Sequence, residues 1–224
     1  LYLTAFLASL PFTWHALAEF RRHPGWMALL MLAAGWTNIA FVEAVLQGNI
    51  LRVLLLFYLS PLWAVLMGRI VLREILSRNA LISLLLAMSG ALIMLWDQKI
   101  GVPWPRDAAD WYALSAGFAF ALSNVLVRKM DDISVQMKSA SVWFGVVLLA
   151  LIMIPLLQLE TPRLTHGIFA GAVGLGLFGI LVMTVLVQYG VTHLPVHRSA
   201  VLALIELVAG ALSQQLLTDE IVSL

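Results

Sequence analysis

Residues 43–78 read EAVLQGNILRVLLLFYLSPLWAVLMGRIVLREILSR, and residues 189–224 read YGVTHLPVHRSAVLALIELVAGALSQQLLTDEIVSL. Aligned without gaps, these 36-residue segments share seven identities: Val45/Val191, Arg52/Arg198, Leu56/Leu202, Leu66/Leu212, Glu74/Glu220, Ile75/Ile221 and Ser77/Ser223. The charged matches carry more weight than the apolar ones, because apolar helices match by accident and charges are scarce in this chain. Arg52 and Glu74 therefore recur as Arg198 and Glu220, 22 residues apart and offset by 146 residues.

The composition excludes an ordinary soluble domain. Of the 224 residues, 62% are hydrophobic and 11% are charged, whereas soluble domains carry roughly 25% charged residues. A soluble fold of this size has too little interior to bury so much apolar surface, so we expect lipid to be the solvent. The net charge of +1 gives no nucleic-acid footprint. Cysteine is absent, which excludes disulfides, thiol chemistry and thiolate metal sites.

Hydrophobic segments of about 20 residues predict membrane-spanning helices. Eight segments fit this length: 1–18, 25–47, 50–72, 80–96, 111–127, 137–158, 166–189 and 196–217. The predicted connections are short, and the longest, Asp97 to Asp110, holds Pro103 and Pro105. It also separates the two repeats, so we predict one unit over 1–98 and a second over 99–224. The fold class predicted here is an all-α polytopic membrane protein.

The distribution of basic residues predicts the orientation of these spans. Alternate loops hold nine Lys and Arg residues: Arg21, Arg22, Arg69, Arg73, Arg78, Arg128, Lys129, Lys138 and Arg198. The opposite loops hold four: Arg52, Lys99, Arg106 and Arg163. Because positive charge accumulates on the cytoplasmic side, we expect the first span to run inward. The repeat offset covers five spans, an odd number, so the second copy is predicted to be inverted. Inverted repeats are typical of secondary transporters, whose substrate site lies near the midplane.

Polar residues deep in the predicted spans are the candidate site residues. Glu206 lies near the middle of span 196–217, and it is either a carrier of protons, a partner for a cationic substrate, or a carboxyl held by a neighbouring helix. Intramembrane ionisable groups favour the functional interpretation. Six uncharged polar residues are also deep, suit a polar pocket as a set, and can each instead bond helices together: Asn38, Tyr58, Ser60, Asn124, Thr184 and Gln188.

Two further features concern helix geometry and charge pairing. Pro61 removes a backbone hydrogen bond inside its span, which predicts a kink and a candidate hinge near the carbonyl of Phe57. Glu43 and Arg52 flank one outer turn and are expected to form an ion pair that ties two helix ends. Arg198, the repeat mate of Arg52, is either a gate residue or a cytoplasmic surface charge.

Motifs of several enzyme classes are missing from the sequence. It holds no H-E-x-x-H, G-x-S-x-G or Walker A pattern. Only His193 and His197 have the spacing of metal ligands on one helix, and Pro195 stands between them. We therefore expect no enzyme activity, no metal site and no cofactor.

Two stretches, Ala44 to Leu95 and Leu186 to Glu220, resemble the drug/metabolite transporter superfamily, EamA type. Pro61 matches a mid-helix proline of that family, Glu74 and Glu220 match an acid that ends its fourth and ninth helices, and Gly90 and Ala91 match a small pair in the next helix. In the ninth helix of that family a glutamate often precedes a second mid-helix proline, and Glu206 falls on the position of this glutamate. Arg73 and Asp219 replace the usual glycine before each acid, and Leu207 replaces that second proline.

The resemblance implies a ten-helix fold of two inverted five-helix repeats, of which this chain would hold helices two to nine and lack the first and last. It implies a bacterial inner-membrane protein, multi-pass, with a central cavity among helices one to four and six to nine. The cavity candidates that follow from the resemblance are Trp14, Asn38, Tyr58, Ser60, Asn124, Trp143, Thr184, Gln188 and Glu206. Since the chain begins at Leu1 inside a span, we expect it to be part of a longer protein.

The sequence as a whole predicts a secondary transporter that exports or exchanges small metabolites, such as amino acids or drugs, by alternating access. Its partners would be the substrate, the lipid bilayer and protons as coupling ion. The alternatives are an intramembrane lipid-modifying enzyme, which needs clustered catalytic groups at one interface, and a non-transporting membrane subunit. The substrate, the direction of transport and the oligomeric state do not follow from the sequence.

Overall fold

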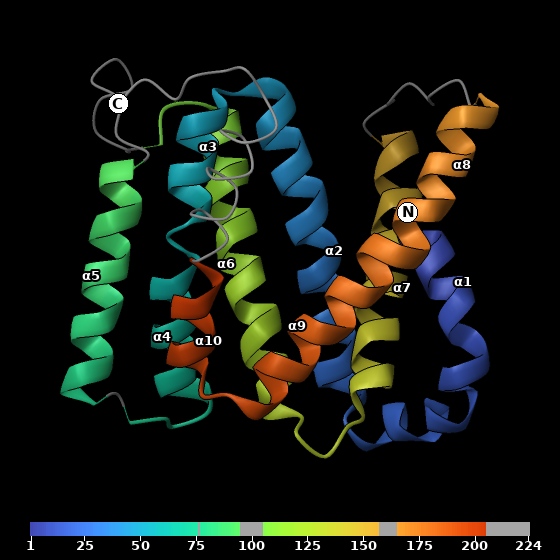
Figure 1. Ribbon diagram of the computed structural model, residues 1–224, viewed down its shortest axis with the longest axis horizontal. Helices are drawn as coiled ribbons and strands as arrows, with labels where there is room; N and C mark the ends of the chain where they lie inside the picture. The colour runs from blue at the N-terminus through green and yellow to red at the C-terminus, as the bar shows by residue number, and fades with distance from the viewer. Residues whose placement is uncertain (76, 95–104, 157–164, 205–224) are drawn as a thin grey trace.

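The computed structural model describes residues 1–75, 77–94, 105–156 and 165–204 (Figure 1). Across these ranges the chain is helical, which confirms the all-α prediction. The elements are α1 (Tyr2–Thr13), η1 (Trp14–Arg22), α2 (Pro24–Gln47), α3 (Ile50–Phe57), α4 (Ser60–Val71), α5 (Arg78–Met94), α6 (Ala108–Lys129), α7 (Val135–Leu156), α8 (His166–Gly174), η2 (Leu175–Ile180), α9 (Leu181–His193) and α10 (Val196–Ala203).

These described elements form eight helical segments that match the eight predicted spans. The 3₁₀ helix η1 extends α1, α3 and α4 are two parts of one segment, and the π-helical turn η2 joins α8 to α9. The predicted limits agree with the observed ones to within a few residues, except that the last span is described only to Leu204.

Four of the described helices are long and apolar enough to cross a membrane: Pro24–Gln47, Arg52–Val71, Val135–Leu156 and His166–His193. The helix His166–His193 is mostly exposed, because only 6% of its most apolar 18-residue stretch is buried inside the protein. Large apolar side chains such as Phe178 and Leu186 are 79% and 67% exposed. Monomeric soluble proteins rarely expose continuous apolar surface on this scale, so this surface is consistent with lipid as the solvent.

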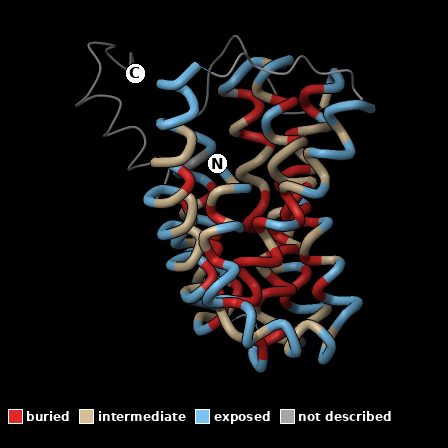
Figure 2. The backbone as a smooth tube through the Cα atoms, turned by 90° about the vertical axis from the view of Figure 1, so that its right-hand side faces the viewer, coloured by how far each residue is buried: buried red, intermediate tan, exposed pale blue. Residues whose placement is uncertain are grey.

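Helix α6 lies at the centre of the bundle and contacts α2, α3, α4, α9 and α10. Its inward face is built of small side chains, among them Ala113, Gly117 and Ala121, all of which are buried. These small side chains let the neighbouring helices pack closely against α6. Figure 2 shows the buried residues concentrated along the middle of the molecule, with exposed residues on the outward-facing turns.

Glycine also sets the crossing of α2 and α7. A Cβ atom on Gly35 would lie 2.6 Å from the carbonyl oxygen of Gly145, and one on Gly145 would collide with the backbone of Met31. Only hydrogen atoms fit between these two backbones. By contrast, a Cβ atom added to Gly167 or Gly171 in α8 would meet nothing within 4 Å, so neither glycine marks a close helix contact in the described part of the chain.

All four basic connections lie at the same edge of the bundle, the lower edge of Figure 1. They join η1 to α2, α4 to α5, α6 to α7, and α9 to α10. Helix α4 runs towards this edge and α10 runs away from it (Figure 1). The described parts of the two aligned segments are therefore antiparallel, as an inverted repeat requires.

Candidate functional site

The helix break before Pro61 brings three of the predicted site residues together. Ser60 and Pro61 in α4 and Asn124 in α6 line a small cavity of about 20 Å³ that Ser199 in α10 completes. A cavity of this size holds about one water molecule. Two hydroxyl groups and one amide, from three different helices, thus line the cavity. The rest of its lining is mostly apolar.

The break has a local cause. Helix α3 ends at Phe57, and α4 begins at Ser60 with proline in its first turn, so no N–H at position 61 can donate to the carbonyl of Phe57. That carbonyl instead faces Gly117 of α6, where an added Cβ would lie 2.7 Å from the oxygen. The kink predicted at Pro61 is confirmed, and a glycine on the neighbouring helix accommodates it.

The predicted partner of Arg52 is wrong. We expected an ion pair with Glu43, but the Arg52 Nε donates to both carboxylate oxygens of Asp110 in α6, at 2.8 and 2.7 Å. Asp110 also accepts from the backbone N–H of Arg106 at 2.8 Å. Glu43, also buried, accepts from Gln47 one turn later at 2.7 Å. The Arg52–Asp110 pair therefore joins the first half of the chain to the second, whereas a pair between Arg52 and Glu43 would have stayed within the first half.

A second polar cluster lies at the basic edge, where α4, α6, α7, α9 and α10 begin or end. The Arg128 guanidinium lies 3.6 Å from the Glu74 carboxylate and donates to the backbone carbonyl of Thr192. Glu74 also accepts from the first N–H of α10, that of Val196, at 3.0 Å. Glu74 thus bonds across the molecule to the second half of the chain.

Lys138 belongs to the same cluster and is fully buried. Its ammonium donates to the Thr192 hydroxyl at 3.2 Å. Two cations, Arg128 and Lys138, therefore converge on one residue of α9. Sequence reasoning counted Lys138 among the charges of a cytoplasmic loop, whereas it lies in the first turn of α7 with its side chain inside the protein.

Further contacts between the halves line the same edge. The Ser134 N–H donates to Glu19 at 2.7 Å, and His23 lies 3.1 Å from Asp132. The Arg22 guanidinium is 3.9 Å from the same aspartate. These contacts are more exposed than the buried pair at the opposite edge, so each contributes less to stability.

The remaining predicted site residues lie apart from the small cavity. Asn38 accepts from the Tyr2 hydroxyl at 2.6 Å and joins α2 to α1. Trp143 is buried among α1, α7 and η2, and its indole N–H has no hydrogen-bond partner in the described part of the chain. Trp14 is 69% exposed on η1, which is unlike a cavity residue.

Four more predicted residues lie elsewhere in the bundle. Tyr58 lies at the helix break with its ring against Phe57, Gln188 is buried in α9, and Thr184 is half-buried one turn earlier. Arg198 is exposed at the start of α10. Glu206 and Glu220 lie outside the described residues.

Sequence reasoning missed Asp110, Thr192 and the buried state of Lys138. The signals were present: Asp110 is an acid at the outer start of a span, on the same predicted side as Arg52, and Lys138 falls inside the predicted span 137–158. Within the described ranges, no group of three His, Asp or Glu residues could hold a metal ion.

Comparison with known proteins shows the fold alone. No protein-family model matches the chain, and a search of curated proteins found no significant match. A solved crystal structure is similar over 99% of this chain and 78% of its own, with a TM-score of 0.74 and 16% sequence identity. At this identity the likeness establishes a shared arrangement of helices and no activity.

Proposed function

We propose that this chain is a secondary transporter of the drug/metabolite type, which moves small metabolites across the bacterial inner membrane by alternating access. The observation that carries the proposal is the cavity at the helix break, where Ser60, Asn124 and Ser199 meet inside an otherwise apolar bundle. Polar groups at such a depth are costly unless they serve a pathway or a binding site. One of the three comes from the first half of the chain and two come from the second.

The ion pairs at the two edges support alternating access. Arg52–Asp110 joins the halves at one edge, and Glu74–Arg128 joins them at the other. A transporter of this kind opens one side at a time by rocking one repeat against the other around a fixed site. In this proposal each pair holds its own side closed and separates when that side opens.

The break in the α3–α4 segment supplies the bend that such motion needs. Discontinuous helices mark binding sites in many transporters, because their free backbone groups face the substrate. Here the free carbonyl of Phe57 packs on Gly117. We propose that α4 pivots at Pro61 and that the small cavity enlarges as it does so.

Flux measured in proteoliposomes tests the proposal. The full chain would be reconstituted and screened for uptake of radiolabelled amino acids and cationic drugs. For a substrate that is transported, Asn124→Leu should lower the rate at least tenfold, because it removes the amide and fills the cavity. Thr37→Val is the matched control, since the Thr37 hydroxyl bonds only its own helix at Ala33. Absence of flux for every compound would contradict transport, and lipid turnover in the same vesicles would favour an enzyme.

Proton coupling is a separate part of the proposal and rests on Glu206, which the sequence places near the middle of its span. A pH gradient should drive accumulation by the unaltered chain. Glu206→Gln, which cannot bind or release a proton, should abolish that pH dependence while leaving counterflow exchange intact. Accumulation that still follows the pH gradient in this variant removes Glu206 from the coupling mechanism.

A further inference from the structure

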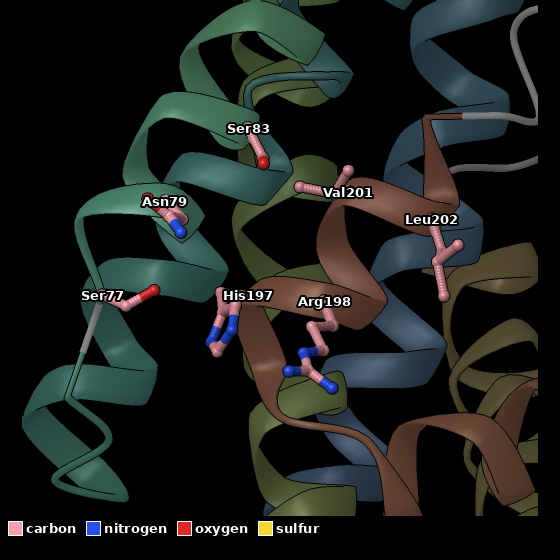
Figure 3. Close-up of a pocket in the computed structure, with 7 residues that line it drawn as sticks. All are labelled: Ser77, Asn79, Ser83, His197, Arg198, Val201 and Leu202. Atoms are coloured by element: carbon pink, nitrogen blue, oxygen red, sulfur yellow. The ribbon is translucent and has the colours of Figure 1, made fainter.

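A second, larger pocket of about 470 Å³ opens between α5 and α10, away from the cavity at the helix break. Figure 3 shows its lining: Ser77, Asn79 and Ser83 on the α5 side face His197, Arg198, Val201 and Leu202 of α10. Its volume falls in the range of small-molecule sites, about 300–1,000 Å³. The proposed function makes no use of this pocket.

The pocket has one apolar end and one polar end. Further along the two helices, Leu84 and Met88 of α5 pack against Leu204, the residue directly after α10. Towards the basic edge the lining becomes polar, with Asn79, His197 and Arg198. Leu202, which lines the pocket, is 51% exposed, and Leu86 of α5 is 69% exposed.

Four side chains of the pocket have polar groups without partners among the described residues. No described side chain forms an ion pair with Arg198, and none forms a hydrogen bond with Asn79 or Ser83. The His197 Nδ1 is shielded from solvent and has no hydrogen-bond partner there. Glu74, near the start of α5, is already engaged by Arg128 and Val196. Within the described ranges the pocket therefore presents unsatisfied donors and an unpaired cation.

We infer that this pocket binds the phosphate headgroup of an anionic membrane lipid. Arg198 supplies the charge, Asn79 and Ser83 supply hydrogen-bond donors, and His197 supplies a further ring nitrogen. Basic pockets between membrane helices on the cytoplasmic side bind such headgroups, and this pocket lies at the edge that carries the basic connections. The exposed apolar side chains beside it suit acyl chains, which a free phosphate lacks. The inference requires the membrane location but not transport activity.

Native mass spectrometry of the purified full chain in detergent tests this inference. The added lipids would be phosphatidylglycerol and phosphatidylcholine with identical acyl chains. We expect phosphatidylglycerol to bind at least fivefold more tightly, and the double variant His197→Gln/Arg198→Gln to lose this preference. A fivefold effect is on the order expected for one basic residue near an anionic lipid surface. Arg21→Gln removes a charge from the exposed 3₁₀ helix η1 at the same edge, and it should leave the preference unchanged.

Two results would overturn the inference. One is equal binding of phosphatidylglycerol by the unaltered chain and the double variant. The other is displacement of the lipid by millimolar inorganic phosphate, which would make the site one for a free anion. Because Arg198 is exposed, its loss should not unfold the chain, and matching thermal melting curves of the two proteins would verify this. Loss of lipid selectivity with normal flux would separate this site from the transport site.

Discussion

At the residue scale, the Arg52–Asp110 pair is the strongest single polar contact between the two halves among the described residues. Both side chains are at least 90% buried, and Asp110 accepts from the Arg52 guanidinium and from the backbone N–H of Arg106. Breaking a buried ion pair by removing one partner typically costs about 3–5 kcal/mol. This is why one substitution there should matter more than several at the exposed edge.

We predict that Asp110→Ala strongly lowers the thermal stability of the purified chain in detergent, by about 3–5 kcal/mol. Asp132→Ala is the matched control, because Asp132 is about half exposed in its contacts with Arg22 and His23. The control should change stability by less than about 1 kcal/mol. Melting curves followed by tryptophan fluorescence would show the difference, and equal curves for the two variants would contradict the ranking.

Lys138 gives a second prediction at this scale. A buried ammonium whose described partner is a single hydroxyl is costly to fold, so we do not expect Lys138 to stabilise the protein. Lys138→Met should keep or raise the melting temperature while lowering substrate flux. A variant that is less stable and transports normally would show instead that Lys138 has only a structural role.

At the element scale, the break between α3 and α4 depends on two residues in different helices. Pro61 removes the hydrogen bond, and Gly117 leaves room for the carbonyl of Phe57. A methyl group at position 117 would force the two backbones apart at the point where α6 packs closely on the break.

Gly117→Ala should therefore destabilise the chain by about 1–3 kcal/mol, as overpacking does. Gly90→Ala in α5 is the control, because an added Cβ there meets nothing within 4 Å. Alanine favours helix over glycine by about 1 kcal/mol, so the control should be neutral or stabilising. If both substitutions stabilise the chain equally, the packing of α6 on the break is not tight.

The helices and the kink were predictable from the sequence because they follow from local physics. Long apolar segments must satisfy their backbone hydrogen bonds internally, and proline breaks the pattern wherever it stands. The pairing of Arg52 with Asp110 was not predictable in the same way, because 58 residues separate them and Glu43 was a nearer acid. The burial of Lys138 was also missed, since a charge at the start of a span normally reaches water.

The candidate site was also predictable only in part. Ser60 and Asn124 were predicted as site residues from their depth and Pro61 as a hinge from its missing N–H, and the three share one cavity. Trp14 was predicted as a cavity residue from the family resemblance, but α1 ends at Thr13 and Trp14 begins the exposed 3₁₀ helix η1. Depth along a helix follows from sequence, whereas the direction in which a side chain points depends on its neighbours in space.

At the scale of the whole molecule, the proposed transporter requires a bundle that crosses the membrane with its four basic connections inside. The structure places these connections at one edge and gives α4 and α10 opposite directions. The exposed apolar surface of α8 and α9 favours lipid around it. The proposal therefore requires that this common edge lie in the cytoplasm and that the second half of the chain be inverted relative to the first.

Single-cysteine labelling in intact cells tests that topology, because the chain has no cysteine of its own. Lys129→Cys would mark the end of α6, and Lys99→Cys would mark the segment that separates the two halves in sequence. A membrane-impermeant maleimide should label Lys99→Cys in intact cells, and should label Lys129→Cys only after the membrane is permeabilised. Equal labelling of both positions without permeabilisation would contradict the inverted arrangement and, with it, the proposed transport mechanism.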